Sequence, residues 1–405
     1  MNNKISNVYT YAALFLVLII DAMGIGLVMP LLGPLFLNRT SAIVAANMGV
    51  HMRDIIYGLT LASFCVFMFF GAPFLGDLSD HIGRKKVLLI CLFGTALGLG
   101  VSAFGLSEQS LVLLILGRAI AGFMAGSQSL AEAAIVDIST PQNKMLNLSI
   151  ISFASCFGFV LGPMLSGFLA NIKFGHGVSY AVPFWVASAL ALLNGCCLFF
   201  TFKETYEPKT VQKLHLTRGM KIFVSAFTNK TVRRLTVIYL LAETGWALYF
   251  QFIPLYLIKN YHYNVQHISY VMAFMGFIFA ISLLLIVRVV KKYLTPKQIT
   301  FYFLFVTALG LIVPVLVKTE IVLWLSIIPA SIGGALFYVS LLTLFSESVG
   351  DDVQGWVMGV FGAIVAVSWS LGGIFSGVLE LVGMYIPFIV SSFLLIIGAL
   401  VVNVE

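Results

Sequence analysis

Long runs of apolar residues, separated by short polar segments, divide the chain along its whole length. Twelve such runs can be drawn, at residues 8–36, 57–77, 85–106, 110–137, 146–170, 181–202, 232–257, 267–289, 297–317, 320–346, 354–383 and 385–403. At ~1.5 Å of rise per residue, each is long enough to cross ~30 Å of hydrocarbon as a helix. The runs do not alternate as the strands of a membrane barrel do. The pattern therefore predicts an all-α membrane protein with twelve transmembrane helices.

One long polar stretch interrupts this pattern near the middle of the chain. We therefore expect three parts: an N-terminal six-helix bundle at 1–202, a cytoplasmic linker at 203–231 and a C-terminal six-helix bundle at 232–405. An acid precedes a proline in the first run and again in the seventh, as Asp21 with Pro30 and Glu243 with Pro254. Two pseudo-symmetric bundles with a site between them are the usual layout of secondary transporters.

Composition and charge support this interpretation. Hydrophobic residues make up 60% of the chain and charged residues 10%, whereas a soluble domain has about 25% charged residues. A water-soluble enzyme and a disordered chain are therefore excluded. The net charge of +7 does not indicate nucleic acid, because 17 of the 23 lysines and arginines fall in segments on one side of the predicted bundles and five on the other. Basic loops stay in the cytoplasm, so we expect both termini there.

The sequence shows no pattern for a cofactor, a metal or a disulfide framework. The five cysteines lie inside apolar runs, the six histidines lack ligand spacing, and no phosphate-binding loop occurs. A membrane-embedded enzyme or a receptor would need a nucleophile–base pair, a metal cluster or a long soluble domain. We therefore expect a non-enzymatic protein without a cofactor, which is not itself powered by a P-loop ATPase; the proton gradient is the energy source that we expect from the acids and the resemblance described below.

Two acids lie near the middle of predicted helices, where a charge is costly. Asp21 lies about 13 residues into the first run and Glu243 about 11 residues into the seventh, so we expect both near the bilayer midplane. Placing a carboxylate there costs ~2.5–3.5 kcal/mol, so each acid should be protonated, paired or exposed to a wet cavity. We interpret both as candidate proton carriers in a central cavity. A structural carboxyl group that hydrogen-bonds a neighbouring helix is the alternative.

The residues that follow Glu243 are candidates for contact with a substrate. Trp246, Tyr249 and Gln251 lie within the next eight positions. An acid beside aromatic rings can attract a cationic or aromatic compound through charge and through the faces of the rings. Ordinary packing of the aromatic side chains is the alternative.

The fourth run is the most polar of the twelve. Its polar and small residues recur at steps of three and four, on one helix face: Arg118, Gly122, Ala125, Gln128, Ser129 and Glu132. An arginine on such a face must point into the bundle. We expect Arg118, Gln128 and Glu132 to take part in proton coupling or to line the cavity, with a fixed ion pair as the alternative.

The segment after the second run carries the most specific signal. It reads Gly76-Asp-Leu-Ser-Asp80-His-Ile-Gly83-Arg84-Lys85-Lys86. Gly83 permits a tight turn, and Asp80 and Arg84 can join the ends of two helices. Asp137, at the end of the fourth run, is a natural partner for Arg84. We expect a cytoplasmic gating motif that favours one of two packings of the bundles.

The fifth run combines small residues with a proline. Gly158, Gly162 and Gly167 allow close helix approach, and Pro163 bends the helix. Together with the loop motif and with Gly117-Arg118, Gly122 and Gly126, this run resembles the major facilitator superfamily, specifically its twelve-span drug/proton antiporters. The segment from Asp21 to Pro30 is similar to the first span of bacterial tetracycline/proton antiporters.

This resemblance implies the major facilitator fold, a bacterial inner membrane and a functional monomer. It implies a cytoplasmic charge relay for Arg84 and Asp137, proton coupling for Arg118, a cavity position for Asp21 and an antiporter motif in the fifth run. The tetracycline antiporters carry further acids in spans three and nine, whereas this chain has Glu132 and Glu243 instead. We expect proton-driven export of small, partly apolar compounds; proton-driven uptake of a metabolite or siderophore is the alternative.

Overall fold

The computed structural model describes residues 2–37, 43–44, 47–137, 144–170, 173–174, 177–178, 180–205, 216–350 and 353–402. The first half of the chain forms α1 (Asn2–Leu37), α2 (Val50–Ile82), α3 (Arg84–Ser107), α4 (Leu111–Phe123), α5 (Ser127–Asp137), α6 (Lys144–Ala170), the antiparallel hairpin β1 (Lys173–Phe174) and β2 (Gly177–Val178), and α7 (Ala181–Thr201). The second half forms α8 (Arg218–Thr228), α9 (Arg233–Tyr261), α10 (Val265–Ile281), the π-helical segment η1 (Ser282–Ile286), α11 (Val287–Val290), α12 (Pro296–Leu316), α13 (Glu320–Glu347), α14 (Gln354–Glu380) and α15 (Ile386–Val401).

The predicted all-α membrane fold is confirmed. Within the described residues, 10 segments are helical, long and apolar enough to cross a membrane, α4 with α5 and α10 with α11 each counting as one. The 16-residue α15 is apolar but shorter. The 29-residue α9 is long enough but more polar, since it carries Glu243 and Gln251. These helices account for the twelve apolar runs of the sequence.

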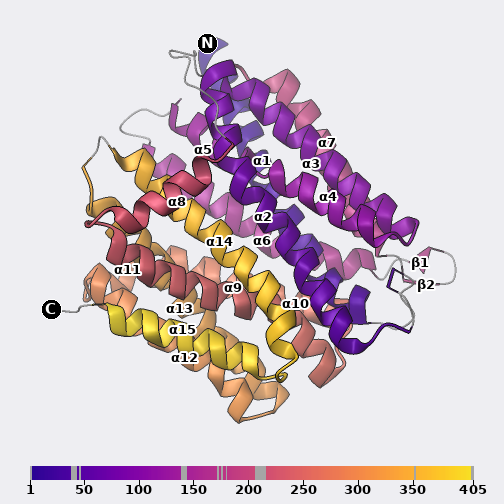
Figure 1. Cartoon of the computed structure of the whole chain (residues 1–405). Coiled ribbons are helices and arrows are strands. Elements are labelled where there is room, and N and C mark those ends of the chain that lie inside the picture. The colour runs from indigo at the N-terminus through magenta and orange to yellow at the C-terminus, as the bar shows by residue number, and fades with distance from the viewer. Residues whose placement is uncertain are drawn as a thin grey trace.

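The helices pack in the same way in both halves of the chain (Figure 1). In the first half, α1 packs against α6 and α7, α3 against α4 and α7, and α2 against α4. In the second half, α9 packs against α14 and α15, α12 against α13 and α15, and α10 against α13. Across the two halves, α2 lies along α14 and α6 along α10. Any cavity between the halves is therefore bordered mainly by these four helices together with α1 and α9.

The fourth run differs from its prediction as one continuous helix, because α4 ends at Phe123 and α5 begins at Ser127. Gly122 lies just before this break and Gly126 lies within it, and glycine weakens helices. Both glycines also contact α2: a Cβ atom at Gly122 would overlap the carbonyl oxygen of Phe64, and one at Gly126 would lie 3.1 Å from the Leu75 side chain. The helix is thus interrupted where α2 packs closely against it and where the local helix propensity is low.

The predicted linker contains a helix that the polar pattern did not predict. Gly219 of α8 packs on α2, since a Cβ atom there would lie 2.6 Å from the carbonyl oxygen of Phe69. On its other side, α8 contacts α14: the indole nitrogen of Trp356 donates a hydrogen bond to Ser225 (3.0 Å). Helix α8 therefore lies between α2 and α14.

We name the two ends of the helix bundle by what they carry: α8 marks the linker end, and β1 with β2 marks the hairpin end (Figure 1). At the hairpin end, α2 and α14 meet backbone to backbone. A Cβ atom at Gly58 would overlap the carbonyl oxygen of Gly373, and one at Gly377 would overlap that of Asp54. The two helices are thus in direct contact at the hairpin end and separated by α8 at the linker end.

Two basic residues that the sequence placed in loops at the hairpin end lie inside helices instead. Arg53 is buried in α2 and donates a hydrogen bond to the carbonyl oxygen of Phe36 (3.0 Å). Lys259 lies in α9 and pairs with acids on α2 and α14. The helices α2 and α9 extend beyond their apolar runs, because both cations find partners that let the helices continue.

Candidate functional site: a central cavity and its approaches

A cavity of about 340 Å³ lies between the two halves of the chain. Its walls are largely apolar, with many aromatic rings, and come mainly from α1, α2, α6, α9, α10, α13 and α14, with Phe64, Phe159, Trp246, Phe250, Phe279 and Trp369 among the lining residues. Of the described residues that line it, Glu243 is the one with a carboxyl group. The cavity can therefore enclose an apolar or aromatic molecule and offers it a single acid.

Glu243 is held in the wall by a specific contact. Its side chain is 4% exposed, and its Oε1 atom accepts a hydrogen bond from the indole nitrogen of Trp369 (2.9 Å). Trp246, one turn further along α9, packs on Gly334, where a Cβ atom would lie 3.1 Å from the indole ring. The acid is thus positioned by α14 from across the helix interface.

Of the three residues predicted to contact a substrate, only Trp246 lines the cavity. Tyr249 lies away from it, and its ring packs edge-on against Phe388 of α15 (5.6 Å between ring centres). Gln251 also lies away from it, is fully buried and donates a hydrogen bond to the carbonyl oxygen of Trp369 (2.9 Å). Each residue turns a helix by about 100°, so closeness in sequence does not place these side chains on one face.

Asp21 and Arg118 line a second, smaller cavity of about 80 Å³ inside the first half of the chain. Asp21 of α1 lies beside Ser127 at the start of α5. Arg118 is 3% exposed and lies over the ring of Phe64, 4.8 Å from its centre. Its Nε and Nη2 atoms have no hydrogen-bond partner among the described residues, and it forms no ion pair there. The alternative of a fixed ion pair for Arg118 is therefore not observed.

Gln128 borders both cavities and also a third one, a vestibule of about 450 Å³ at the linker end. Its amide nitrogen donates hydrogen bonds to Glu132 (3.3 Å) and Ser155 (3.5 Å). Glu132 and Ser129 line the vestibule, so they keep the common face that the spacing predicted despite the helix break. Gln128 thus connects the acid of the vestibule with the central cavity.

The loop motif forms the wall of the vestibule and the start of α3. Arg84 pairs with Asp80 (2.9 Å between Nη1 and Oδ1), and the Lys85 ammonium donates to the carbonyl oxygen of Phe199 (2.8 Å). Gly83 has φ of +98°, which favours glycine. A Cβ atom at Gly76 would meet only open space. The side chain of Asp137 lies outside the described residues, so its pairing with Arg84 stays a prediction.

Two further charged contacts at this end were not predicted. Asp77, which is not among the predicted site residues, pairs with Arg218 of α8 and so joins the linker helix to α2. The carboxylate of Glu204 accepts hydrogen bonds from the backbone nitrogens of Arg84 (2.8 Å) and Lys85 (3.1 Å). Glu204 therefore caps the N-terminus of α3, where a negative charge is favourable.

We expect Glu204→Ala to lower the free energy of unfolding by about 0.5–2 kcal/mol, because the first turn of α3 would lose its cap. Thermal unfolding of the purified protein measures this effect. Glu347→Ala, an exposed acid at the end of α13, is the matched control and should leave the midpoint unchanged. Equal midpoints for the two variants would contradict the capping role.

The glycines of α6 act as packing positions. A Cβ atom at Gly158 would overlap the carbonyl oxygen of Ile19, and one at Gly162 would overlap that of Met23, both in α1. Pro163 lies against Gly26 of α1, where a Cβ atom would be 2.9 Å from its Cδ atom. A Cβ atom at Gly167 would instead lie 2.9 Å from Cβ of Ser269 on α10. The segment thus joins α6 to α1 and also to the second half of the chain.

Comparison with known families agrees with this architecture. The sequence model of the Major Facilitator Superfamily matches residues 14–373, most of the chain. The chain belongs to this superfamily. It is a multi-pass membrane transporter of small molecules and not an enzyme.

Relatives of known name support a place within the Major Facilitator Superfamily. The quinolone resistance protein NorA of Staphylococcus aureus is 25% identical over 95% of this chain and 93% of its own length. The class B tetracycline resistance protein of Escherichia coli is 28% identical over 57% of this chain, and the match spans 55% of that protein. The solved structure of a D-xylose-proton symporter shares the fold, with a TM-score of 0.76 and 15% identity over 96% of this chain and 97% of that one. The predicted resemblance to drug/proton antiporters is thereby confirmed.

Proposed function

We propose that this chain is a proton-coupled secondary transporter that exports small, partly apolar organic compounds, including drugs, by alternating access. The observation that carries the proposal is Glu243, a carboxyl group 4% exposed in the wall of the aromatic cavity. A carboxyl group held there by one indole can carry a proton or face a cationic group of the cargo. Binding of the two would then compete, which is the requirement for exchange.

The central cavity and the vestibule together form the path that we propose for the cargo. The central cavity is closed toward the hairpin end by the contact of α2 with α14, and it meets the vestibule of the linker end at Met68 and Gln128. Charge distribution favours the linker end as the cytoplasmic side, with both termini there. We propose that the bundles at 1–202 and 232–405 rock around this cavity, in the bacterial inner membrane and as a functional monomer.

The remaining site residues fit supporting roles in this scheme. Asp21 and Arg118 share one small cavity, so a proton on Asp21 would change the field at the arginine. Gln128 links that cavity to Glu132. We assign proton coupling to these residues, gating to the segment from Gly76 to Lys85, and helix packing to the glycines of α6. No cofactor is needed, since the proton gradient supplies the energy.

The direction of transport separates the two candidate functions. The names of the relatives, resistance proteins for quinolone and tetracycline, favour export, whereas the fold is shared with a proton symporter. Accumulation of ethidium, a lipophilic cationic dye, in intact cells that express the chain tests this. Export predicts low accumulation that rises several-fold when an uncoupler is added. Accumulation above control cells that collapses with the uncoupler would instead establish uptake.

A further inference from the structure

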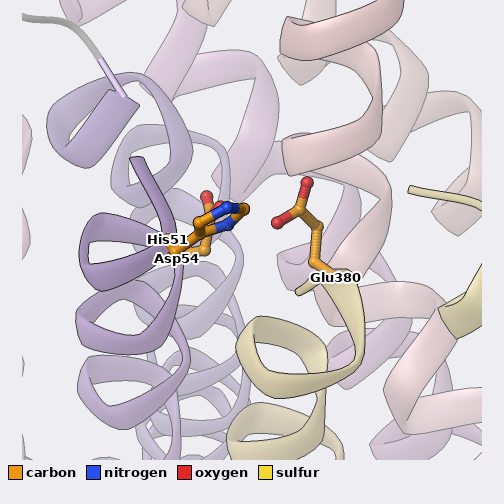
Figure 2. A group of neighbouring side chains, drawn as sticks. All are labelled: His51, Asp54 and Glu380. Carbon is orange, nitrogen blue, oxygen red and sulfur yellow. The ribbon is translucent and has the colours of Figure 1, made fainter. Parts of the chain in front are cut away.

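Three charged side chains from three helices meet at the hairpin end, apart from the central cavity. The ammonium group of Lys259 donates hydrogen bonds to Asp54 (2.7 Å to Oδ2) and to Glu380 (2.8 Å to Oε1). Asp54 is 0% exposed and Glu380 9%. Figure 2 shows His51 and Asp54 on α2 facing Glu380 on α14 across the helix interface. The cluster therefore bridges the two halves of the chain where they are closed.

The charges in this cluster do not balance. Two carboxylates and one ammonium leave one excess negative charge in a buried place. Asp54 Oδ1 and Glu380 Oε2 are buried and have no hydrogen-bond partner among the described residues. An uncompensated buried charge is costly, and so is a buried acceptor without a donor. One proton shared by the two carboxyl groups would remove the excess charge and supply the missing donor.

The other groups near the cluster have partners of their own or face solvent. Besides the three members, the titratable and charged groups next to the cluster are His51 and Tyr57 of α2, and Arg53 precedes Asp54 in the sequence. Arg53 donates to the carbonyl oxygens of Phe36 and Met48, and the Tyr57 hydroxyl donates to that of Gln251. His51 is exposed, so water screens its charge.

A metal ion fits this cluster less well than a proton. One ligand atom from each of His51, Asp54 and Glu380 lies within 4.8 Å of the others, a spacing that can suit a divalent cation. The Lys259 ammonium, however, already contacts both carboxylates. A divalent cation would turn an excess of one negative charge into an excess of one positive charge and would repel the ammonium.

We propose that Asp54 and Glu380 form a proton-binding site at the hairpin end, which takes up one proton from the outer solution when α2 closes on α14 and releases it when they part. In the closed state, the backbone contact at Gly377 and Gly58 excludes water from the carboxyl groups. In an open state, water would solvate both carboxylates and the need for the proton would disappear. The proposal goes beyond the transport function and holds for export and for uptake alike.

The direction of the pH effect follows from the difference in bound protons between the closed and open states. The closed state binds one more proton than the open state, so acid outside favours closure and rising pH favours opening. For one proton, the ratio of closed to open molecules changes by up to about tenfold per pH unit. External protons would thus return the transporter to the state in which α2 and α14 are in contact at the hairpin end.

A pair of spin labels at the hairpin end tests the proposal. Met52 on α2 and Val382, just after α14, are 50% and 75% exposed and flank the cluster. Each is replaced by cysteine in the full chain, with the native cysteines replaced, in lipid nanodiscs. Distances between the labels, measured by double electron–electron resonance from pH 5 to pH 8, should show the closed population rising as pH falls. Asp54→Asn and Glu380→Gln should each remove this dependence.

Matched variants separate the site from its surroundings. Glu320→Gln, an acid at the same end that accepts from the Tyr263 hydroxyl, should keep the full response. Glu380→Asp should also keep it, which guards against misfolding of the glutamine variant. Glu243→Gln changes the acid of the central cavity and leaves the cluster in place, so the effect of Asp54→Asn is also measured in that background, where it should still lower the pH response if the transport function fails. The proposal is overturned by a full response in Asp54→Asn and Glu380→Gln, by its loss in His51→Ala, or by its loss when a chelator is added.

Discussion

Replacing Glu243 by glutamine is expected to lower uphill transport by about 5- to 150-fold, the range of typical coupling free energies between two ligands. Glutamine keeps a carbonyl oxygen that can accept the hydrogen bond from Trp369, so the wall of the cavity should remain in place. It cannot bind a proton, so cargo and proton would no longer compete. Dye efflux from energised cells, normalised to the amount of protein in the membrane, measures the loss.

Downhill exchange provides the internal control for this variant. Proteoliposomes that carry the variant, with dye on both sides and no pH gradient, should still exchange it, because the aromatic wall of the cavity is intact. Glu320→Gln removes an acid at the hairpin end, away from the cavity, and should leave both activities unchanged. Full uphill transport by Glu243→Gln would contradict the role of this acid as the proton carrier.

The second large effect is expected at Gly162, where even alanine should destabilise the protein. A Cβ atom there would overlap the carbonyl oxygen of Met23 and lie 2.8 Å from the nitrogen of Leu27. Both are backbone atoms of α1 and cannot move aside as a side chain can. Forcing extra volume into such a contact costs about 1–3 kcal/mol. We expect Gly162→Ala to lower the melting temperature and the yield of folded protein.

Gly24→Ala is the matched control for this prediction. Gly24 lies in α1 itself, and a Cβ atom there would have no neighbour within 4 Å. Alanine also favours helix over glycine, so this variant should melt at the same temperature as the wild type or above it. A Gly162→Ala protein as stable as Gly24→Ala would show that α1 and α6 are packed less closely than described.

The helices could be predicted from the sequence because the membrane restricts the possibilities. A run of apolar residues long enough to span the bilayer must become a helix, since backbone groups have no other partners in lipid. The break between α4 and α5 could not be read from hydropathy, because it depends on the fit of Gly122 against α2. Helix α8 was missed because its apolar face is short and its binding surface is made by α2 and α14.

The site was predicted in part, for reasons that differ between residues. Asp21, Arg118 and Glu243 stood out because a charge in an apolar run needs a polar environment, and each lines a cavity. Asp54 and Lys259 lie just outside the ends of the apolar runs, so hydropathy does not separate them from loop residues. Their role depends on a third helix, α14, more than a hundred residues further along the chain.

Movement of cargo and protons in opposite directions through the cavity of Glu243 is measured directly in proteoliposomes that hold a pH indicator inside. Ethidium is added on the side of the linker end, and the internal pH is followed for the wild type and for Glu243→Gln. The predicted result is proton movement opposite to that of ethidium in the wild type and no such movement in the variant. Proton movement in the same direction as ethidium, or equal proton movement in both proteins, would contradict exchange at Glu243.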